Sequence, residues 1–116
     1  MTWTASAALS DKLVSVPPLK SSLFLADYRE IVTYLAGVNP DSADRFCDAL
    51  EAALDLLSRH PEAGRLAGFP LAPKVRRWGV SGFRNYLLFY QARTDGVLLV
   101  RLLHGSRNLP PLLPGD

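Results

Sequence analysis

The spacing of apolar residues changes once along this chain, and that change limits the folds open to it. From residue 24 to residue 57, apolar side chains recur every three or four positions, which is the period of a helix with one buried face. From residue 75 to residue 104, they alternate or run together in blocks separated by Gly-containing turns, which is typical of strands. Helices followed by an antiparallel sheet predict an α+β fold.

The helical region is predicted to form two helices joined by a short turn. Gly37 is expected to end the first helix in the left-handed conformation. Asn39 suits the N-cap of the second helix, Pro40 suits its first position, and Pro61 ends it. Such a short connection makes the pair an antiparallel hairpin. The expected apolar faces are Phe24, Tyr28, Ile31 and Leu35 in the first helix, and Ala43, Phe46, Cys47, Leu50, Ala53, Leu54 and Leu57 in the second.

Three strands are predicted after a Gly- and Pro-rich loop at residues 62–73. They are Val75–Val80, Phe83–Ala92 and Val97–Leu103, with turns at Ser81-Gly82 and Asp95-Gly96. A weaker strand is expected at residues 13–16, where Pro17 and Pro18 confine it to an edge of the sheet. The expected division is a loose N-terminal tail at residues 1–12, the folded domain at 13–109 and a Pro-rich tail at 110–116.

Both faces of the predicted sheet are apolar. Alternation places Leu87 and Phe89 opposite Tyr86, Leu88 and Tyr90, and it places Val97, Leu99 and Leu103 opposite Leu98, Val100 and Leu102. Two helices cover only one face well, so the other face is predicted to be an exposed apolar surface that binds a partner. The alternative is that the 62–73 loop and the C-terminal tail fold over it.

Composition excludes several classes of function. The single cysteine, Cys47, forms no internal disulfide, and the two separated histidines, His60 and His104, make no metal site with it. We therefore expect no metal and no cofactor. No apolar run approaches the roughly 18 residues of a membrane-spanning helix, and the N-terminus lacks the pattern of a secretory signal. These features predict a cytoplasmic protein.

Charge is divided unevenly along the chain. Residues 27–62 contain eight acids and three bases, whereas residues 63–116 contain eight bases and two acids. A basic half of this kind meets either nucleic acid or an acidic protein segment. The alternative is that acidic helices neutralise a basic sheet within the same molecule.

Five stretches of sequence, in this order and spacing, resemble the RelE/ParE toxins of type II toxin–antitoxin (plasmid stabilisation) modules. They are Ala26–Leu35, Asn39–Leu54, His60–Arg65, Val75–Tyr90 and Asp95–Leu109. The resemblance is closest to the ParE branch, in which the last strand ends in a motif similar to His104-Gly105-Ser106-Arg107. It implies a RelE/ParE-like fold, with an N-terminal strand, an antiparallel helical hairpin and a three-stranded antiparallel meander packed on the helices.

The resemblance also implies a partner and a target. Such toxins are neutralised by a co-expressed antitoxin, for which an acidic, amphipathic segment would suit the basic half of this chain. ParE-like members inhibit DNA gyrase, whereas RelE-like members are ribosome-dependent mRNA endonucleases. One fold therefore carries two classes of function. The ParE-like features favour gyrase inhibition without catalysis, and the nuclease remains the alternative.

A nuclease would need an acid, a base and cations for the phosphate. The candidates for that chemistry are His104, Glu62, Arg84 and Arg107. RelE-like nucleases typically add clustered basic residues and a tyrosine near the C-terminus. Here no tyrosine or histidine follows His104, and the chain has only three lysines. The catalytic set is incomplete, and a histidine such as His104 at the end of an apolar strand is more often structural.

Binding residues are predicted on the basic half and on the aromatic strand. The candidates for contact with a target or antitoxin are Arg65, Arg76, Arg77, Arg84, Tyr86, Leu88, Tyr90 and Arg107. Arginine favours planar, bidentate contacts with carboxylates or phosphates. A further hypothesis is that Arg76, Arg77 and Trp78 bind nucleic acid directly. Alternatively, Arg65 ties the hairpin to the sheet, and the tyrosines belong to the core.

Overall fold

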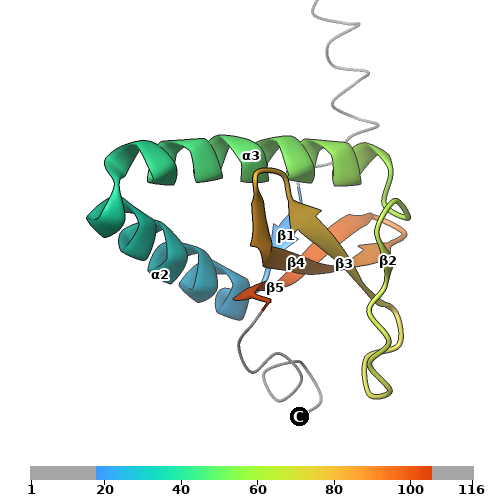
Figure 1. Ribbon diagram of the computed structural model, residues 1–116. Coiled ribbons are helices and arrows are strands. Elements are labelled where there is room, and N and C mark those ends of the chain that lie inside the picture. Colours follow the sequence, from blue (N-terminus) through green and yellow to red (C-terminus); the bar gives the residue numbers. More distant parts are fainter. Residues whose placement is uncertain (1–17, 106–116) are drawn as a thin grey trace, which may run out of the picture.

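The computed structural model describes residues 18–105 as two helices and a five-stranded sheet (Figure 1). The elements are β1 (Leu19–Lys20), α2 (Ser22–Val38), α3 (Pro40–Arg59), β2 (Arg65–Leu66), β3 (Val75–Val80), β4 (Phe83–Arg93) and β5 (Gly96–His104). The strand order is β1-β5-β4-β3-β2, with β1 parallel to β5 and the other pairs antiparallel. The predicted α+β fold, with a helical hairpin followed by a meander, is confirmed.

The N-terminal strand lies later than predicted. β1 follows the two prolines, at Leu19–Lys20, and pairs with Leu98 and Leu99 of β5. Ser21 comes next and joins three elements, because its hydroxyl accepts the Phe24 N–H (2.9 Å) and donates to the Val100 carbonyl (2.8 Å). The segment expected to form this strand, residues 13–16, lies outside the described residues, as do the tails expected at 1–12 and 110–116.

A single residue joins the two helices. The expectation that Gly37 ends the first helix is wrong, because α2 continues to Val38. Asn39 is extended (φ −163°), and its N–H donates to the Leu35 carbonyl (2.8 Å) to close α2. Its side-chain oxygen accepts the Asp41 N–H (2.9 Å) and begins α3, in which Pro40 takes the first position as predicted. α3 ends at Arg59, just before Pro61.

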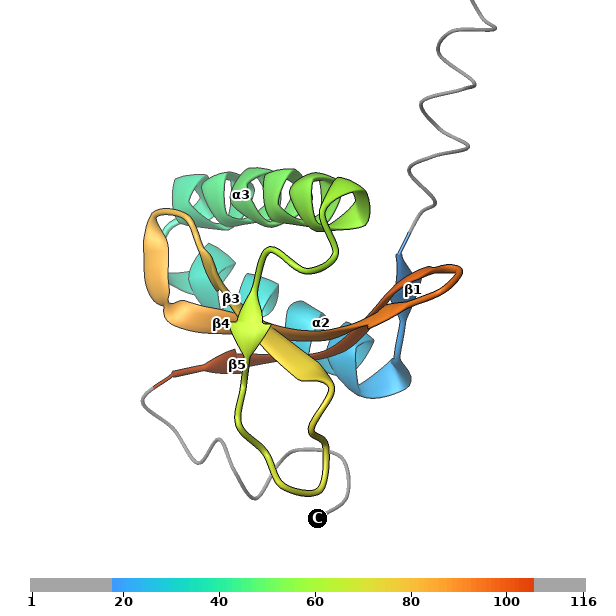
Figure 2. The ribbon, with the colours of Figure 1, turned by 90° about the vertical axis from the view of Figure 1, so that its right-hand side faces the viewer.

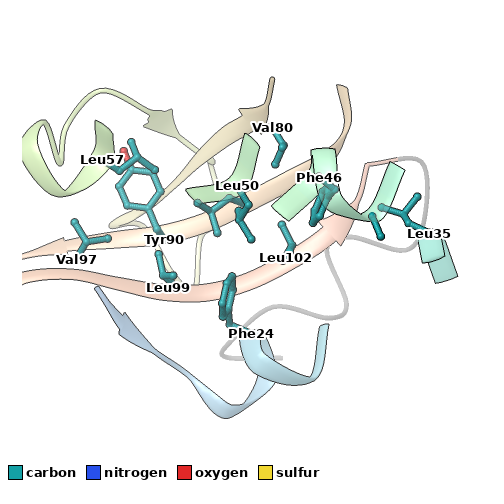
Figure 3. Close-up of a cluster of buried hydrophobic side chains, with 12 residues drawn as sticks. Phe24, Leu35, Phe46, Leu50, Leu57, Val80, Tyr90, Val97, Leu99 and Leu102 are labelled. Carbon is teal, nitrogen blue, oxygen red and sulfur yellow. The ribbon is translucent and has the colours of Figure 1, made fainter. Parts of the chain in front are cut away.

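Both helices pack on the same face of the sheet, and α3 crosses above it (Figures 1 and 2). The helix-side core between them contains Phe24, Leu35, Ala43, Phe46, Leu50, Leu57, Val80, Leu88, Tyr90, Val97, Leu99 and Leu102 (Figure 3). Phe46 is fully buried, with its ring at 88° to that of Phe83 and 67° to that of Tyr86. Edge-to-face aromatic contacts of this kind orient the second helix on the sheet.

The residues of β5 are divided between the two faces of the sheet differently from the prediction, because the strand contains a β-bulge. Phe89 pairs with Arg101, but the next residue, Tyr90, pairs with Leu99, so Val100 is an extra residue in β5. Alternation therefore resets at this point. Leu102 lies in the helix-side core and Leu103 on the other face, the reverse of the prediction.

The second face of the sheet is largely covered. Its cluster contains Val75, Phe89, Val100 and Leu103, with Ala67, Phe69, Ala72, Leu87 and Leu98 packed against it. The ring of Phe69 lies 5.7 Å from that of Phe89. The loop predicted at 62–73 thus includes the short strand β2 and folds back over the sheet. The expectation of an exposed apolar face is wrong, because the loop covers it as in the alternative, whose C-terminal tail lies outside the described residues.

Among residues 18–105, neither helix is both long enough and apolar enough to cross a membrane.

Candidate functional site

A shallow hollow of about 730 Å³ opens at the β2–β3 edge of the sheet. It is lined by Glu62, Ala63, Gly64, Arg65, Arg76, Arg77, Trp78, Gly79 and Leu87. Three of the predicted binding residues, Arg65, Arg76 and Arg77, therefore meet in one place. We call this site the arginine hollow.

Two of these arginines face each other across the strand pair. Arg65 and Arg77 are directly opposite in the β2–β3 register, and both are exposed. Like charges at directly opposite positions repel and destabilise a sheet. Within the described part of the chain, neither guanidinium lies within ion-pair distance of a carboxylate. The pair is therefore a ready site for an anionic group.

Among the side chains that the structure describes, the acidic helices neutralise little of the basic half. The ion pairs found among residues 18–105 are Arg59–Asp55, Arg93–Asp95 and Arg101–Asp27. Among these, Arg101–Asp27 alone joins a helix to the sheet. The internal-pairing explanation thus accounts for one sheet arginine and leaves the arginine hollow positive.

Arg76 and Tyr90 bind the turn that forms one wall of the arginine hollow. Arg76 donates to the Gly64 carbonyl (2.7 Å). The buried Tyr90 hydroxyl donates to the Pro61 carbonyl (2.8 Å) and accepts the Gly64 N–H (2.8 Å). Burial raises the pKa of Tyr90. Together the two side chains hold the 61–64 turn against the sheet, so that the following strand starts at Arg65.

The structure corrects two of the predicted binding residues. Leu88 and Tyr90 lie in the helix-side core with no exposed surface, so neither contacts a partner. The prediction that Leu88 and Tyr90 share one face of β4 is correct, but that face is the one that the helices cover. Tyr86 is half-buried on the same face, between Phe46 and His104.

The candidate acid and base do not come together. His104 ends β5 opposite Tyr86, with its ring 5.0 Å from the tyrosine ring. Glu62 lines the hollow beside Arg76, which pairs with Tyr90. Tyr86 and Tyr90 are four residues apart on β4, which corresponds to about 13 Å of strand. The strand positions beside Glu62 and His104 are therefore four residues apart on β4.

Arg84 and Arg107 complete the predicted set. Arg84 lies in β4 close to the turn that follows β3. Arg107 lies outside the described residues. No three His, Cys, Asp or Glu side chains within residues 18–105 gather where they could hold a metal ion.

One polar contact was missed from the sequence. Asp27 was placed off the apolar stripe of the first helix, but it is buried and binds Arg101 of β5. The available signal was its spacing, since Asp27 lies three residues after Phe24 and one before Tyr28. A charged residue on a buried stripe indicates a buried partner.

Comparisons with known proteins identify the family of this chain. Residues 20–109 match the family described as the ParE toxin of the type II toxin–antitoxin system, parDE. The chain is also 31% identical over 80 residues to Toxin RelE1 of Caulobacter vibrioides, a match that covers 68% of this chain and 82% of the relative. Since the family match spans most of the chain and nearly all of the described fold, this protein belongs to the ParE toxin family of type II toxin–antitoxin systems.

Proposed function

We propose that this ParE-family toxin arrests growth by binding DNA gyrase, and that a cognate antitoxin neutralises it through an acidic segment. Family membership supports the toxin role. The gyrase target is an inference from the ParE branch and from the chemistry of the surface.

The observation that carries the choice of target is the separation of Glu62 from His104. General acid–base cleavage of RNA needs both groups within about one hydrogen bond of the scissile phosphate. Here the β4 residues beside the two groups, Tyr90 near the Arg76 strand position and Tyr86 opposite His104, are about 13 Å apart along the strand. Inhibition of a large enzyme needs no proton transfer, only shape and charge. A protein-binding toxin therefore fits this arrangement better than a nuclease does.

The arginine hollow supports an acidic partner. Arg65 and Arg77 lie opposite each other without a carboxylate partner in the described chain. A carboxylate placed between them would relieve their repulsion and accept planar, paired hydrogen bonds. Arg84, Tyr86 and Arg107 remain further candidates for contact with target or antitoxin.

Induced expression of the chain alone, with and without the product of the neighbouring reading frame, tests the toxin–antitoxin pairing. We expect growth arrest and a DNA-damage response, both reversed by co-expression of the partner. Purified toxin is then assayed for inhibition of gyrase supercoiling and for mRNA cleavage on translating ribosomes. Cleavage without any effect on gyrase would overturn the proposal in favour of the RelE-type nuclease.

Point variants separate the two mechanisms. Arg65→Ala and Arg77→Ala should weaken antitoxin binding, whereas Arg29→Ala, on an exposed position of α2, serves as the charge-matched control. Arg84→Ala and Arg107→Ala should reduce gyrase inhibition. His104→Ala should leave gyrase inhibition intact if its thermal unfolding is unchanged. A nuclease, by contrast, would lose activity with His104→Ala alone.

A further inference from the structure

The outer edge of the sheet is incomplete where β2 stops and β3 continues (Figure 2). β2 pairs with β3 at Arg76 and Arg77, and the residues before it, 61–64, form a turn instead of a longer strand. β3 runs on through Trp78–Val80. Among residues 18–105, no strand lies on the outer side of this last part of β3.

The backbone of Gly79 faces outward at this edge. Ala67 donates its N–H to the Val75 carbonyl (2.9 Å), so the backbone groups of Val75 point towards β2. Backbone direction alternates along an antiparallel strand, so Arg77 and Gly79 point the same way as Val75. Gly79 is exposed and lines the arginine hollow. Its N–H and its carbonyl therefore offer the hollow one donor and one acceptor, with which no strand of the described chain pairs.

A side chain from outside has room beside Gly79. No atom lies within 4 Å of the position that a Cβ on Gly79 would take. Gly79 shares one face of β3 with Arg77, and Arg65 lies directly opposite Arg77 on the same face. A residue paired with Gly79 would therefore lie two positions along from Arg65 and diagonal to Arg77. Diagonal neighbours are about 7–8 Å apart, within reach of long side chains.

The charge and the backbone groups of the hollow together favour an acidic peptide. Its lining carries three arginines, Arg65, Arg76 and Arg77, against one carboxylate, that of Glu62. A second copy of this chain would bring further arginines to the same place, and like charges repel. A free anion would use the N–H of Gly79 but leave its carbonyl without a donor. An extended peptide supplies an acceptor and a donor to this pair of groups.

We infer that an extended acidic peptide adds to the sheet beside Gly79 as a short strand, with its carboxylate between Arg65 and Arg77. The main-chain hydrogen bonds to Gly79 supply affinity, and the two guanidinium groups select an acidic side chain at the paired position. The identity of the natural peptide, the acidic segment of the antitoxin, rests on the proposed function. The strand pairing is tested without that partner.

A synthetic peptide tests the pairing on the full-length chain. The probe is acetyl-Thr-Val-Glu-Val-Thr-amide, and its dissociation constant is measured by titration of backbone amide chemical shifts. We expect the shift changes to centre on Gly79. Replacement of the peptide's glutamate by glutamine should weaken binding about tenfold, because a charge-assisted contact is lost. Methylation of the glutamate's backbone nitrogen removes the donor to the Gly79 carbonyl and should weaken binding about fivefold or more.

Variants of the chain test the same contacts from the other side. Gly79→Pro removes the outward N–H at an edge position, where proline is tolerated, and should weaken peptide binding about fivefold or more. Gly79→Ala is the matched control, since it keeps the N–H and places its methyl group in open space, and its affinity should be unchanged. Arg65→Ala with Arg77→Ala should remove the preference for glutamate over glutamine. Thermal unfolding checks that each variant folds.

Two results would overturn the inference. One is equal affinity for the plain and the N-methylated peptide, a comparison that needs no change to the chain. The other is absence of binding by the plain peptide. Displacement of the peptide by inorganic phosphate, together with indifference to N-methylation, would assign the hollow to free anions or nucleic-acid phosphates instead. Growth arrest and its reversal test the proposed function separately: failure there, with the peptide still bound, would leave the strand pairing and remove the antitoxin as its natural partner.

Discussion

The carboxylate of Asp27 in α2 accepts two hydrogen bonds, of 2.7 and 2.9 Å, from the guanidinium of Arg101 in β5. It also accepts the Leu102 N–H at 3.0 Å, on the free edge of β5 beyond β1. The Asp27 carboxylate raises the pKa of Arg101, chiefly through these bonds. One buried side chain thus anchors the helix to the strand just after the bulge at Val100.

Removal of the Asp27 carboxylate should strongly reduce the stability of the fold. Asp27→Ala removes both hydrogen bonds between the carboxylate and the half-buried Arg101 guanidinium, and we expect a loss of about 3–5 kcal/mol in the free energy of unfolding. Glu30→Ala, at an exposed position of the same helix, is the control and should cost little. Urea denaturation measures both. The double variant Asp27→Leu with Arg101→Met should recover most of the loss, since it buries no lone charge.

The helix-side core should be most sensitive at α3. Phe46 and Leu50 are 0% and 3% exposed. Truncation of either to alanine should cost about 2–5 kcal/mol through lost burial and an unfilled cavity. Asp48→Ala, on the exposed side of α3, is the reference for thermal unfolding. Equal melting temperatures for Phe46→Ala and Asp48→Ala would contradict the packing described here.

Two glycines should respond in opposite directions to the same substitution. At Gly64, a Cβ would lie 2.6 Å from the Arg77 carbonyl oxygen and 2.7 Å from the Tyr90 hydroxyl. Gly64→Ala should therefore destabilise the chain and disturb the arginine hollow, which antitoxin affinity would report. Gly37 lies in α2 with no atom within 4 Å of its Cβ position. Gly37→Ala should stabilise the chain by about 0.5–1 kcal/mol.

Tyr28 should make the fold sensitive to strong alkali. Its hydroxyl lies 3.3 Å from the Cys47 sulfur, and this hydrogen bond, together with burial, raises the pKa of Tyr28 from 10.0 to about 12. The protonated form is the one that the fold favours. Its stabilising contribution is therefore complete below about pH 10 and is lost as the pH rises towards 12.

Ultraviolet titration of tyrosinate measures this effect. Tyr28→Phe should remove one late-ionising tyrosine and flatten the decline of stability over that pH range. Tyr34→Phe is the control, because Tyr34 is 59% exposed in the same helix. A titration curve that Tyr28→Phe leaves unchanged would contradict the assignment.

Local sequence signals predicted the helices and most strand limits well. Asn39 and Pro40 start α3 as expected because capping depends on the residue itself and its near neighbours. The predicted position of the turn between β4 and β5, Asp95-Gly96, is wrong by one residue. The two-residue loop is Thr94–Asp95, and Gly96 is already paired with Arg93. The order and pairing of β3, β4 and β5 followed from short connections.

Features that depend on contacts between distant parts of the chain could not be predicted from the sequence. The bulge at Val100 has no local sequence signature, so Leu102 and Leu103 were assigned to the wrong faces. Alternation separated the two faces of β4 correctly, yet it could not tell which face the helices cover. Tyr90 was consequently predicted to contact a partner, with a place in the core as the alternative. The opposition of Arg65 and Arg77 depends on a two-residue strand inside a loop, which no periodicity reveals.

Asn39 closes one helix and opens the next, and this double role has a dynamic consequence. Neither helix can fray at this end without uncapping the other. Local opening here should therefore involve both helix ends together. Amide protons in the last turn of α2 and the first turn of α3 should exchange with solvent at similar rates, as one cooperative unit.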